Sequence, residues 1–181
     1  MNKQFKLILS VKYLIKTPTY KFILIFYCPS VLLGAVTILL PEPDITGSLV
    51  TESIILDFLI ALIAVPIIET LLFQSLVIEI ICKFIKRPRN NIWIALLASS
   101  SAFALNHTYS TGYIIITFLA GFILAFAYYL GRYRKESAIV LVFIIHSLYN
   151  LSTSVYNLCT YGLPNQWEFG PLSIIVHWRT L

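Results

Sequence analysis

The stretch that decides the fold is residues 54–81, IILDFLIALIAVPIIETLLFQSLVIEII, an apolar run interrupted near its middle by Glu69. A helix that crosses a bilayer needs about 20 mostly apolar residues, and this run is long enough. A carboxyl group inside such a run is costly to bury in hydrocarbon, so it marks a candidate functional residue. The sequence therefore predicts a membrane-spanning helix with one acidic side chain at depth.

The composition of the 181-residue chain agrees with a membrane protein. Hydrophobic residues make up 59% and charged residues 12%, about half of the roughly 25% charge of soluble globular chains. This excludes a soluble globular protein, a disordered chain and a disulfide-rich secreted domain. The three cysteines, Cys28, Cys82 and Cys159, form no framework and are expected to be small apolar filler.

Five membrane spans are predicted along the chain. Residues 22–40 contain no charge and form the first span, and residues 54–81 form the second. Residues 92–131 also lack charge and are long enough for two helices, which meet at the polar break 106–112. Residues 138–158 supply the fifth. The expected fold class is an all-α, polytopic membrane helix bundle.

The charged residues orient these spans. Basic side chains precede the first span and follow the second and the fourth, whereas the other loops are acidic or neutral. Of the 13 basic residues, only Arg179 falls on the opposite side. The positive-inside rule therefore predicts a cytoplasmic N-terminus and an outside C-terminus. The net charge of +5 thus indicates topology, and no nucleic-acid partner is expected.

Three regions are expected in the chain. Residues 1–21 form a basic N-terminal segment, of which residues 3–16 suit a short amphipathic helix on the inner membrane surface. Residues 22–158 form the transmembrane helical domain. Residues 159–181 are rich in aromatic side chains and are expected to form an interfacial tail.

Three ionisable side chains are predicted to lie deep in the membrane: Glu69, His107 and His146. At about 1.5 Å per residue, they lie about 18, 22 and 12 Å from the basic side of their helices. These levels are close enough for the side chains to share one site. A buried histidine can instead bridge helices, and His107 can cap a hairpin. Glu69 needs a partner or a proton, and the chain offers no Lys or Arg at that depth.

The residues around these groups form three short motifs. Phe103 precedes His107 by four residues, and His146 precedes Asn150 by four, so each pair shares a helix face. With Glu69, these motifs resemble the CPBP family of intramembrane proteases, also called Abi, which includes the type II CAAX prenyl endopeptidases. The family pattern is Glu-Glu-x-x-x-Arg, Phe-x-x-x-His and His-x-x-x-Asn. The resemblance covers about residues 65–150, within a predicted core of about 54–158.

The first motif departs from the family pattern at two positions. Thr70 stands where the family has its second Glu, and Gln74 stands where it has Arg. Both charges of a possible intrahelical ion pair are therefore missing together, and a neutral contact between Thr70 and Gln74 is expected in its place.

The resemblance implies a catalytic role for four residues. Glu69 and His107 activate a water for attack on a peptide carbonyl, while His146 and the amide of Asn150 stabilise the oxyanion. Thr70, Gln74 and Phe103 support them. The family is also described as metalloproteases, and Glu69, His107 and His146 are a possible zinc set. We expect either no cofactor or a single divalent metal such as zinc, and favour the metal-free reaction.

The resemblance also implies a substrate class and a location. The expected substrate is a hydrophobic or lipidated peptide at the lipid bilayer. The protein is expected to be a multi-pass protein of the cell membrane, namely a bacterial cytoplasmic membrane. Two alternatives stay open: a non-catalytic bacteriocin-immunity or scaffold protein of the same fold, and a proton or ion carrier. The oligomeric state is not predicted.

Overall fold

The computed structural model describes residues 11–37, 54–85, 88–108 and 110–161, and their regular elements are all helical. Four helices are long and apolar enough to cross a membrane: Thr19–Val36, Ile55–Phe84, Thr111–Gly131 and Ala138–Tyr156. A fifth apolar helix, Ile92–Leu105, is shorter. The expected all-α, polytopic membrane bundle is therefore confirmed, and the protein is a multi-pass membrane protein. The first ten residues and residues 162–181 of the predicted tail lie outside the described residues, while residues 159–161 continue the last helix.

Helix α2 (Thr19–Thr37) begins three residues earlier than the predicted first span and contains Pro29. It is preceded by a short helix at residues 11–16, which includes part of the predicted N-terminal surface segment. The guanidinium of Arg134 donates hydrogen bonds to the carbonyls of Leu14, Ile15 and Thr17. This contact fastens the end of the short helix to the connection between the last two helices.

The second span is one long helical path with an unusual hydrogen-bond register. It comprises α3 (Ile54–Leu59), the π-helical η1 (Ile60–Ala64), α4 (Val65–Glu69), the π-helical η2 (Thr70–Leu76) and α5 (Val77–Phe84). Five α-helical residues that end in Glu69 thus lie between two π-helical segments. π-helical turns are rare and are often found at functional sites.

Three further helices complete the bundle. α6 (Pro88–Leu105) has Pro at its first position, where a missing N–H costs nothing. α7 (Thr111–Gly131) begins at Ser110, whose hydroxyl accepts from the backbone N–H of Tyr113. α8 is Ala138–Tyr161. The polar break predicted near 106–112 is therefore the turn between α6 and α7.

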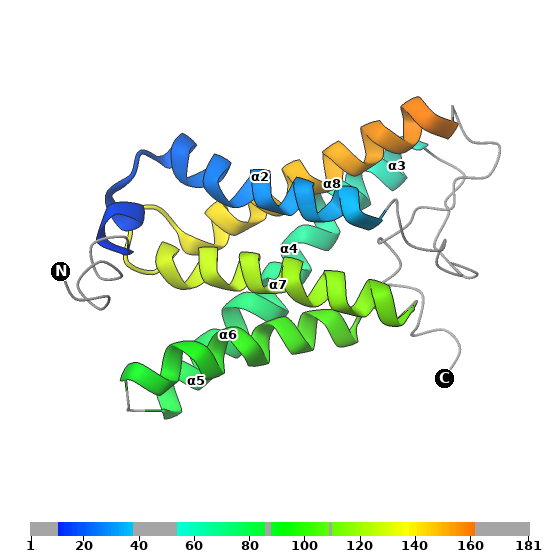
Figure 1. Ribbon diagram of the computed structural model, residues 1–181. Coiled ribbons are helices and arrows are strands. Elements are labelled where there is room, and N and C mark those ends of the chain that lie inside the picture. The colour runs from blue at the N-terminus through cyan, green and yellow to red at the C-terminus, as the bar shows by residue number, and fades with distance from the viewer. Residues whose placement is uncertain (1–10, 38–53, 86–87, 109, 162–181) are drawn as a thin grey trace.

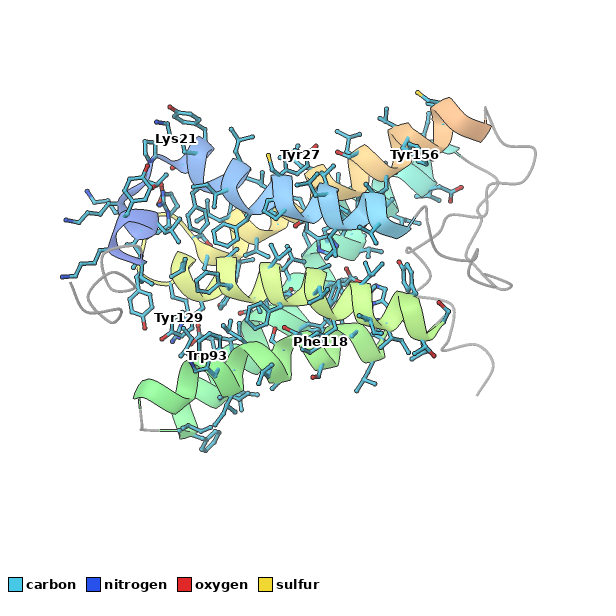
Figure 2. The ribbon with its side chains drawn as sticks, in the orientation of Figure 1. Lys21, Tyr27, Trp93, Phe118, Tyr129 and Tyr156 are labelled. Carbon is cyan, nitrogen blue, oxygen red and sulfur yellow. The ribbon has the colours of Figure 1, made fainter. Side chains whose placement is uncertain are left out.

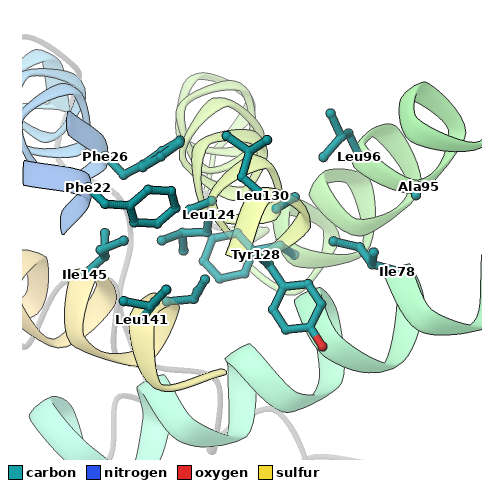
Figure 3. Close-up of a cluster of buried hydrophobic side chains, with 14 residues drawn as sticks. Phe22, Phe26, Ile78, Ala95, Leu96, Leu124, Tyr128, Leu130, Leu141 and Ile145 are labelled. Atoms are coloured by element: carbon teal, nitrogen blue, oxygen red, sulfur yellow. The ribbon is translucent and has the colours of Figure 1, made fainter. Parts of the chain in front are cut away.

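Helix α7 packs against α2, α6 and α8 and forms the centre of the bundle, as Figure 1 shows. The second span crosses these helices obliquely in the same view. A cluster of buried apolar side chains joins α2, α5, α6, α7 and α8 (Figure 3); it includes Phe22, Ile78, Leu96, Leu130 and Leu141. This cluster packs the helices together in the half of the bundle that contains the α7–α8 connection.

The outer surface of the bundle carries large apolar side chains. Leu32, Ile55 and Leu105 are each at least two-thirds exposed, which suits contact with lipid. The short 11–16 helix, the start of α2, the end of α5 and the α7–α8 connection all lie at one end (Figure 1), where Lys21 projects outward in Figure 2. The described basic residues therefore gather at one end of the bundle, as the charge pattern predicts.

Candidate active site

The three ionisable side chains that the sequence places at depth meet inside the bundle. Nε2 of His107 lies 3.6 Å from Oε1 of Glu69, and Nε2 of His146 lies 3.2 Å from Oε2 of the same carboxyl group. Glu69 is 2% exposed, and the two histidines are 3% and 5% exposed. Among the described residues, these two histidines are the basic side chains that lie beside the Glu69 carboxyl group. A carboxyl group thus lies between two imidazoles, away from bulk water.

His107 is positioned by the residues at the end of α6. Its Nδ1 lies 2.7 Å from the carbonyl oxygen of Phe103, and because a carbonyl oxygen only accepts, Nδ1 carries the proton. Nε2 is then directed at Glu69. The Phe103 ring packs at 4.6 Å from the His107 ring and edge-on to His146 at 6.0 Å, between ring centroids. The four-residue spacing therefore supplies both a hydrogen-bond acceptor and a wall for the site.

Phe103 reaches this position because Gly121 of α7 has no side chain. A Cβ at Gly121 would lie 2.9 Å from Cδ1 of Phe103 and 3.1 Å from its Cβ, well inside ordinary carbon–carbon contact. The Phe103 ring also packs edge-on against Phe73 of the second span, with 5.8 Å between centroids. Helices on both sides thus fix the ring that contacts both histidines.

His146 and Asn150 lie one turn apart on α8, and both are buried. Nδ2 of Asn150 donates a hydrogen bond of 2.9 Å to the carbonyl oxygen of Ala61 in η1. Nδ1 of His146 has no hydrogen-bond partner among the described residues. The shared face of His146 and Asn150 is confirmed, while their role at an oxyanion stays a prediction.

A cavity of about 40 Å³ adjoins these side chains, large enough for a small number of water molecules. Its polar wall contains Glu69, His107, His146 and Asn150. Its remaining wall is mostly apolar and comes chiefly from α7, and it is formed by Ser30, Phe103, Tyr113, Ile116, Thr117, Ala120, Leu124 and Tyr149. All four predicted catalytic residues thus line one cavity.

The sequence motifs do not mark Tyr113, Tyr149 or Ser30, which also line this cavity. Tyr149 follows His146 by three residues, so helical spacing was a usable signal for it. Its ring packs so closely on α2 that a Cβ at Gly34 would lie 2.8 Å from it. Ser30 and Tyr113 lie on helices without a motif of their own, and nothing in the sequence singled them out.

Thr70 and Gln74 are both completely buried, but they do not form the expected contact. The hydroxyl of Thr70 and both polar atoms of the Gln74 amide lack a hydrogen-bond partner among the described residues. Both residues belong to the π-helical η2, where i→i+5 hydrogen bonds widen the turn and residues four apart no longer stack as they do in an α-helix. The neutral contact that was expected to replace the ion pair is therefore absent from this part of the structure.

The side chains of a possible metal site, Glu69, His107 and His146, have suitable donor atoms. Within the described ranges, no three His, Cys, Asp or Glu side chains form a group that could hold a metal ion. The Glu69 carboxyl group instead contacts each imidazole directly, at 3.2 and 3.6 Å. Separations of this size also occur between the ligand atoms of a tetrahedral zinc ion, so the metal-free reaction stays a prediction.

Comparison with known proteins gives one match. Residues 51–152, more than half of the 181-residue chain, match the family described as type II CAAX prenyl endopeptidase Rce1-like. The matched segment contains Glu69, His107, His146 and Asn150, but it begins after α2. Neither a curated protein nor a solved structure matches the chain.

Proposed function

The chain belongs to the Rce1-like family of type II CAAX prenyl endopeptidases, and on that premise we propose that it is an intramembrane endopeptidase. It hydrolyses a peptide bond of a hydrophobic or lipidated peptide at the bilayer. The observation that carries this proposal is the Glu69 carboxyl group held between Nε2 of His107 and Nε2 of His146 beside a cavity. A buried carboxyl group with two imidazole neighbours is suited to moving protons.

The proposed reaction uses a water molecule bound in the cavity. Glu69 takes a proton from the water while the water oxygen attacks the carbon of the peptide carbonyl. His107 orients that water through Nε2. His146 donates a hydrogen bond to the oxygen that becomes negatively charged. Glu69 then passes its proton to the departing amine, so the carboxyl group ends the cycle in its starting state.

We propose that this reaction needs no metal ion. A zinc ion bound by one carboxylate and two histidines would polarise the peptide carbonyl and activate the water. Among the described residues no group of three His, Cys, Asp or Glu side chains that could hold a metal ion is found, which supports this proposal, and no step is assigned to a metal. Glu69 is therefore the group on which water activation depends.

The substrate class follows from the position of the site. The cavity adjoins side chains of membrane-spanning helices, and its wall along α7 is mostly apolar, with Ile116, Ala120 and Leu124 spaced four residues apart. A peptide with a lipid or an apolar segment near the cleaved bond can enter such a site without losing much hydration. The proposed partners are this peptide and the surrounding lipid.

The test is cleavage of a farnesylated peptide by purified protein in lipid vesicles. The peptide carries a prenylated cysteine followed by three C-terminal residues, and an unprenylated apolar peptide serves as a second substrate. We expect Glu69→Gln to lower kcat by about 10²–10⁴-fold, the usual contribution of a general base. Cleavage of either peptide at the wild-type rate by this variant would contradict the proposal and favour the non-catalytic alternative.

Glu79→Gln is the matched control, because it makes the same change in the same span. Glu79 is 48% exposed and pairs with Arg132 at 2.8 Å, and it does not line the cavity. Exposed ion pairs contribute about 0–1 kcal/mol to stability. We therefore expect Glu79→Gln to retain nearly full activity, so that a loss specific to Glu69 is assigned to the chemistry.

A further inference from the structure

The backbone of the second span has one hydrogen-bond donor missing just before Glu69. In η1 the N–H of Val65 donates to the carbonyl of Ile60, five residues back. The next residue in this register is Pro66, which would donate to the carbonyl of Ala61, but proline has no N–H. The Ala61 carbonyl is therefore left without its partner within the helix.

The side chain of Asn150 takes the place of this donor. Ala61 is completely buried, and inside a membrane no water is present to satisfy an exposed carbonyl group. Nδ2 of Asn150 donates a hydrogen bond of 2.9 Å to the Ala61 oxygen. A side chain of α8 thus completes the backbone of the helix that carries Glu69.

This hydrogen bond joins the two elements whose side chains meet in the site. Asn150 lies one turn after His146 on α8, and Ala61 lies two turns before Glu69 on the second span. Helix α8 also packs against both η1 and α4. The bond therefore fixes the position of α8 along the second span, and with it the 3.2 Å contact between Glu69 and His146.

We propose that Asn150 is a positioning residue. It donates a hydrogen bond to the Ala61 carbonyl, which Pro66 leaves without a backbone donor, and so aligns Glu69 with His146. This inference rests on the proposed endopeptidase function. It differs from the role at the oxyanion that the family resemblance implies for Asn150, because it assigns the effect of the side chain to the N–H that donates to the Ala61 carbonyl and not to the second N–H of the amide. Pro66, Ala61 and Asn150 form one device in this view.

A double-mutant cycle with Pro66→Ala separates the two roles. The Pro66→Ala variant has an N–H at position 66, which donates to Ala61 in the i→i−5 register that Val65 already follows. Asn150 is then no longer needed to satisfy that carbonyl. A donor to the oxyanion, by contrast, is needed equally whether residue 66 is proline or alanine.

We expect Asn150→Ala alone to lower kcat by about 100-fold with little change in KM, because an ångström-scale misplacement of the catalytic groups costs about that much. In the Pro66→Ala background the same change should cost less than about fivefold. An equal loss in both backgrounds would overturn the proposal. Loss of activity in Pro66→Ala alone would overturn it too, because the proline would then do more than expose a carbonyl.

His146→Ala is the control for this cycle. Its side chain contacts Glu69 directly, so its loss of kcat should be the same in both backgrounds. If Asn150→Ala does not fold, the comparison of Pro66→Ala with the double variant still decides, since an oxyanion donor predicts a folded and inactive double variant.

The melting temperature in detergent provides a readout that does not depend on activity. We expect Asn150→Ala to lower it and Pro66→Ala/Asn150→Ala to recover most of the loss. If the wild type cleaves no peptide, the proposed function fails, yet this stability cycle still tests the hydrogen bond. A melting temperature that does not recover in the double variant would contradict the assignment of Pro66 as the source of the exposed carbonyl.

Discussion

Gly121 allows the sharpest test of how the site is held, because a single methyl group there would displace the ring that contacts both histidines. In Gly121→Ala, the new Cβ would lie 2.9, 3.1 and 3.2 Å from Cδ1, Cβ and Cγ of Phe103. Carbon atoms pack at about 3.5–4.0 Å, so Phe103 must move by about 0.5–1 Å. Its backbone carbonyl holds Nδ1 of His107 at 2.7 Å, and therefore His107 moves with it.

The size of the effect follows from this displacement. Overpacking of a well-packed core costs about 1–3 kcal/mol, and the better helix propensity of alanine returns up to about 1 kcal/mol of that cost. The net loss of stability is therefore small. A shift of about 1 Å in the catalytic groups can lower the rate about 100-fold. We expect Gly121→Ala to fold and to lose about 10–100-fold in kcat.

Gly131→Ala is the matched control in the assay with the farnesylated peptide. A Cβ at Gly131 would lie 3.0 Å from Cβ of Ala138, a similar clash on the same helix, but Gly131 lies at the α7–α8 connection and does not line the cavity. We expect a comparable change in melting temperature and nearly full kcat. Equal losses of kcat in the two variants, or none in Gly121→Ala, would refute the argument that Phe103 positions His107.

Three further predictions concern metal dependence, the N-terminal contact and pH. Incubation with 1,10-phenanthroline should leave the cleavage rate unchanged, because the proposed reaction needs no metal ion. A loss that added zinc reverses would show a metal-dependent enzyme. Arg134→Lys should lower the melting temperature by several degrees in a thermal scan. One ammonium group cannot bond all three carbonyls that accept from the guanidinium, and it cannot cover the Phe22 ring, whose centroid lies 4.6 Å from Cζ of Arg134. An unchanged melting temperature would contradict this prediction. At the same end of the bundle, a hydrogen bond from Thr19 lowers the pKa of Glu136 from its usual 4.5 to about 2, and bonds from the Glu136 backbone and Arg134 add to this. The pKa of Glu136 is lower in the folded than in the unfolded protein, so ionised Glu136 stabilises the fold fully above about pH 4.5, and this stabilisation disappears as the pH falls toward 2. In thermal melts at decreasing pH, the wild type should lose stability over this range, and Glu136→Gln should lose less.

The convergence of Glu69, His107 and His146 could be predicted because charge is scarce in this sequence. In a chain with 12% charged residues, an acidic residue far from any loop needs a partner, and the partners available at that depth were histidines. The same scarcity gave the helical class and the gathering of basic residues at one end. These features follow from solvation, which composition and spacing describe well.

The hydrogen-bond register of the second span could not be predicted in this way. An α-helix and a π-helix with the same side chains have the same hydropathy, so nothing in residues 54–81 distinguishes η1 and η2 from ordinary α-helix. The contact between Asn150 and Ala61 joins residues 89 positions apart, and it involves a backbone carbonyl that no sequence pattern marks. The role of Pro66 therefore became visible only with the packed bundle.

The register also explains why Thr70 and Gln74 can replace a charged pair without bonding to each other. A buried ion pair needs close geometry and further hydrogen bonds to offset the cost of removing two charges from water, and the wide turn of η2 does not stack positions 70 and 74. An unsatisfied neutral polar group costs about 1–3 kcal/mol, whereas breaking a buried ion pair by removing one partner costs about 3–5 kcal/mol. Loss of both charges together avoids an unpaired buried charge, and it leaves Glu69 without a neighbouring charge on its own helix. The two histidines then remain its partners, as the proposed chemistry requires.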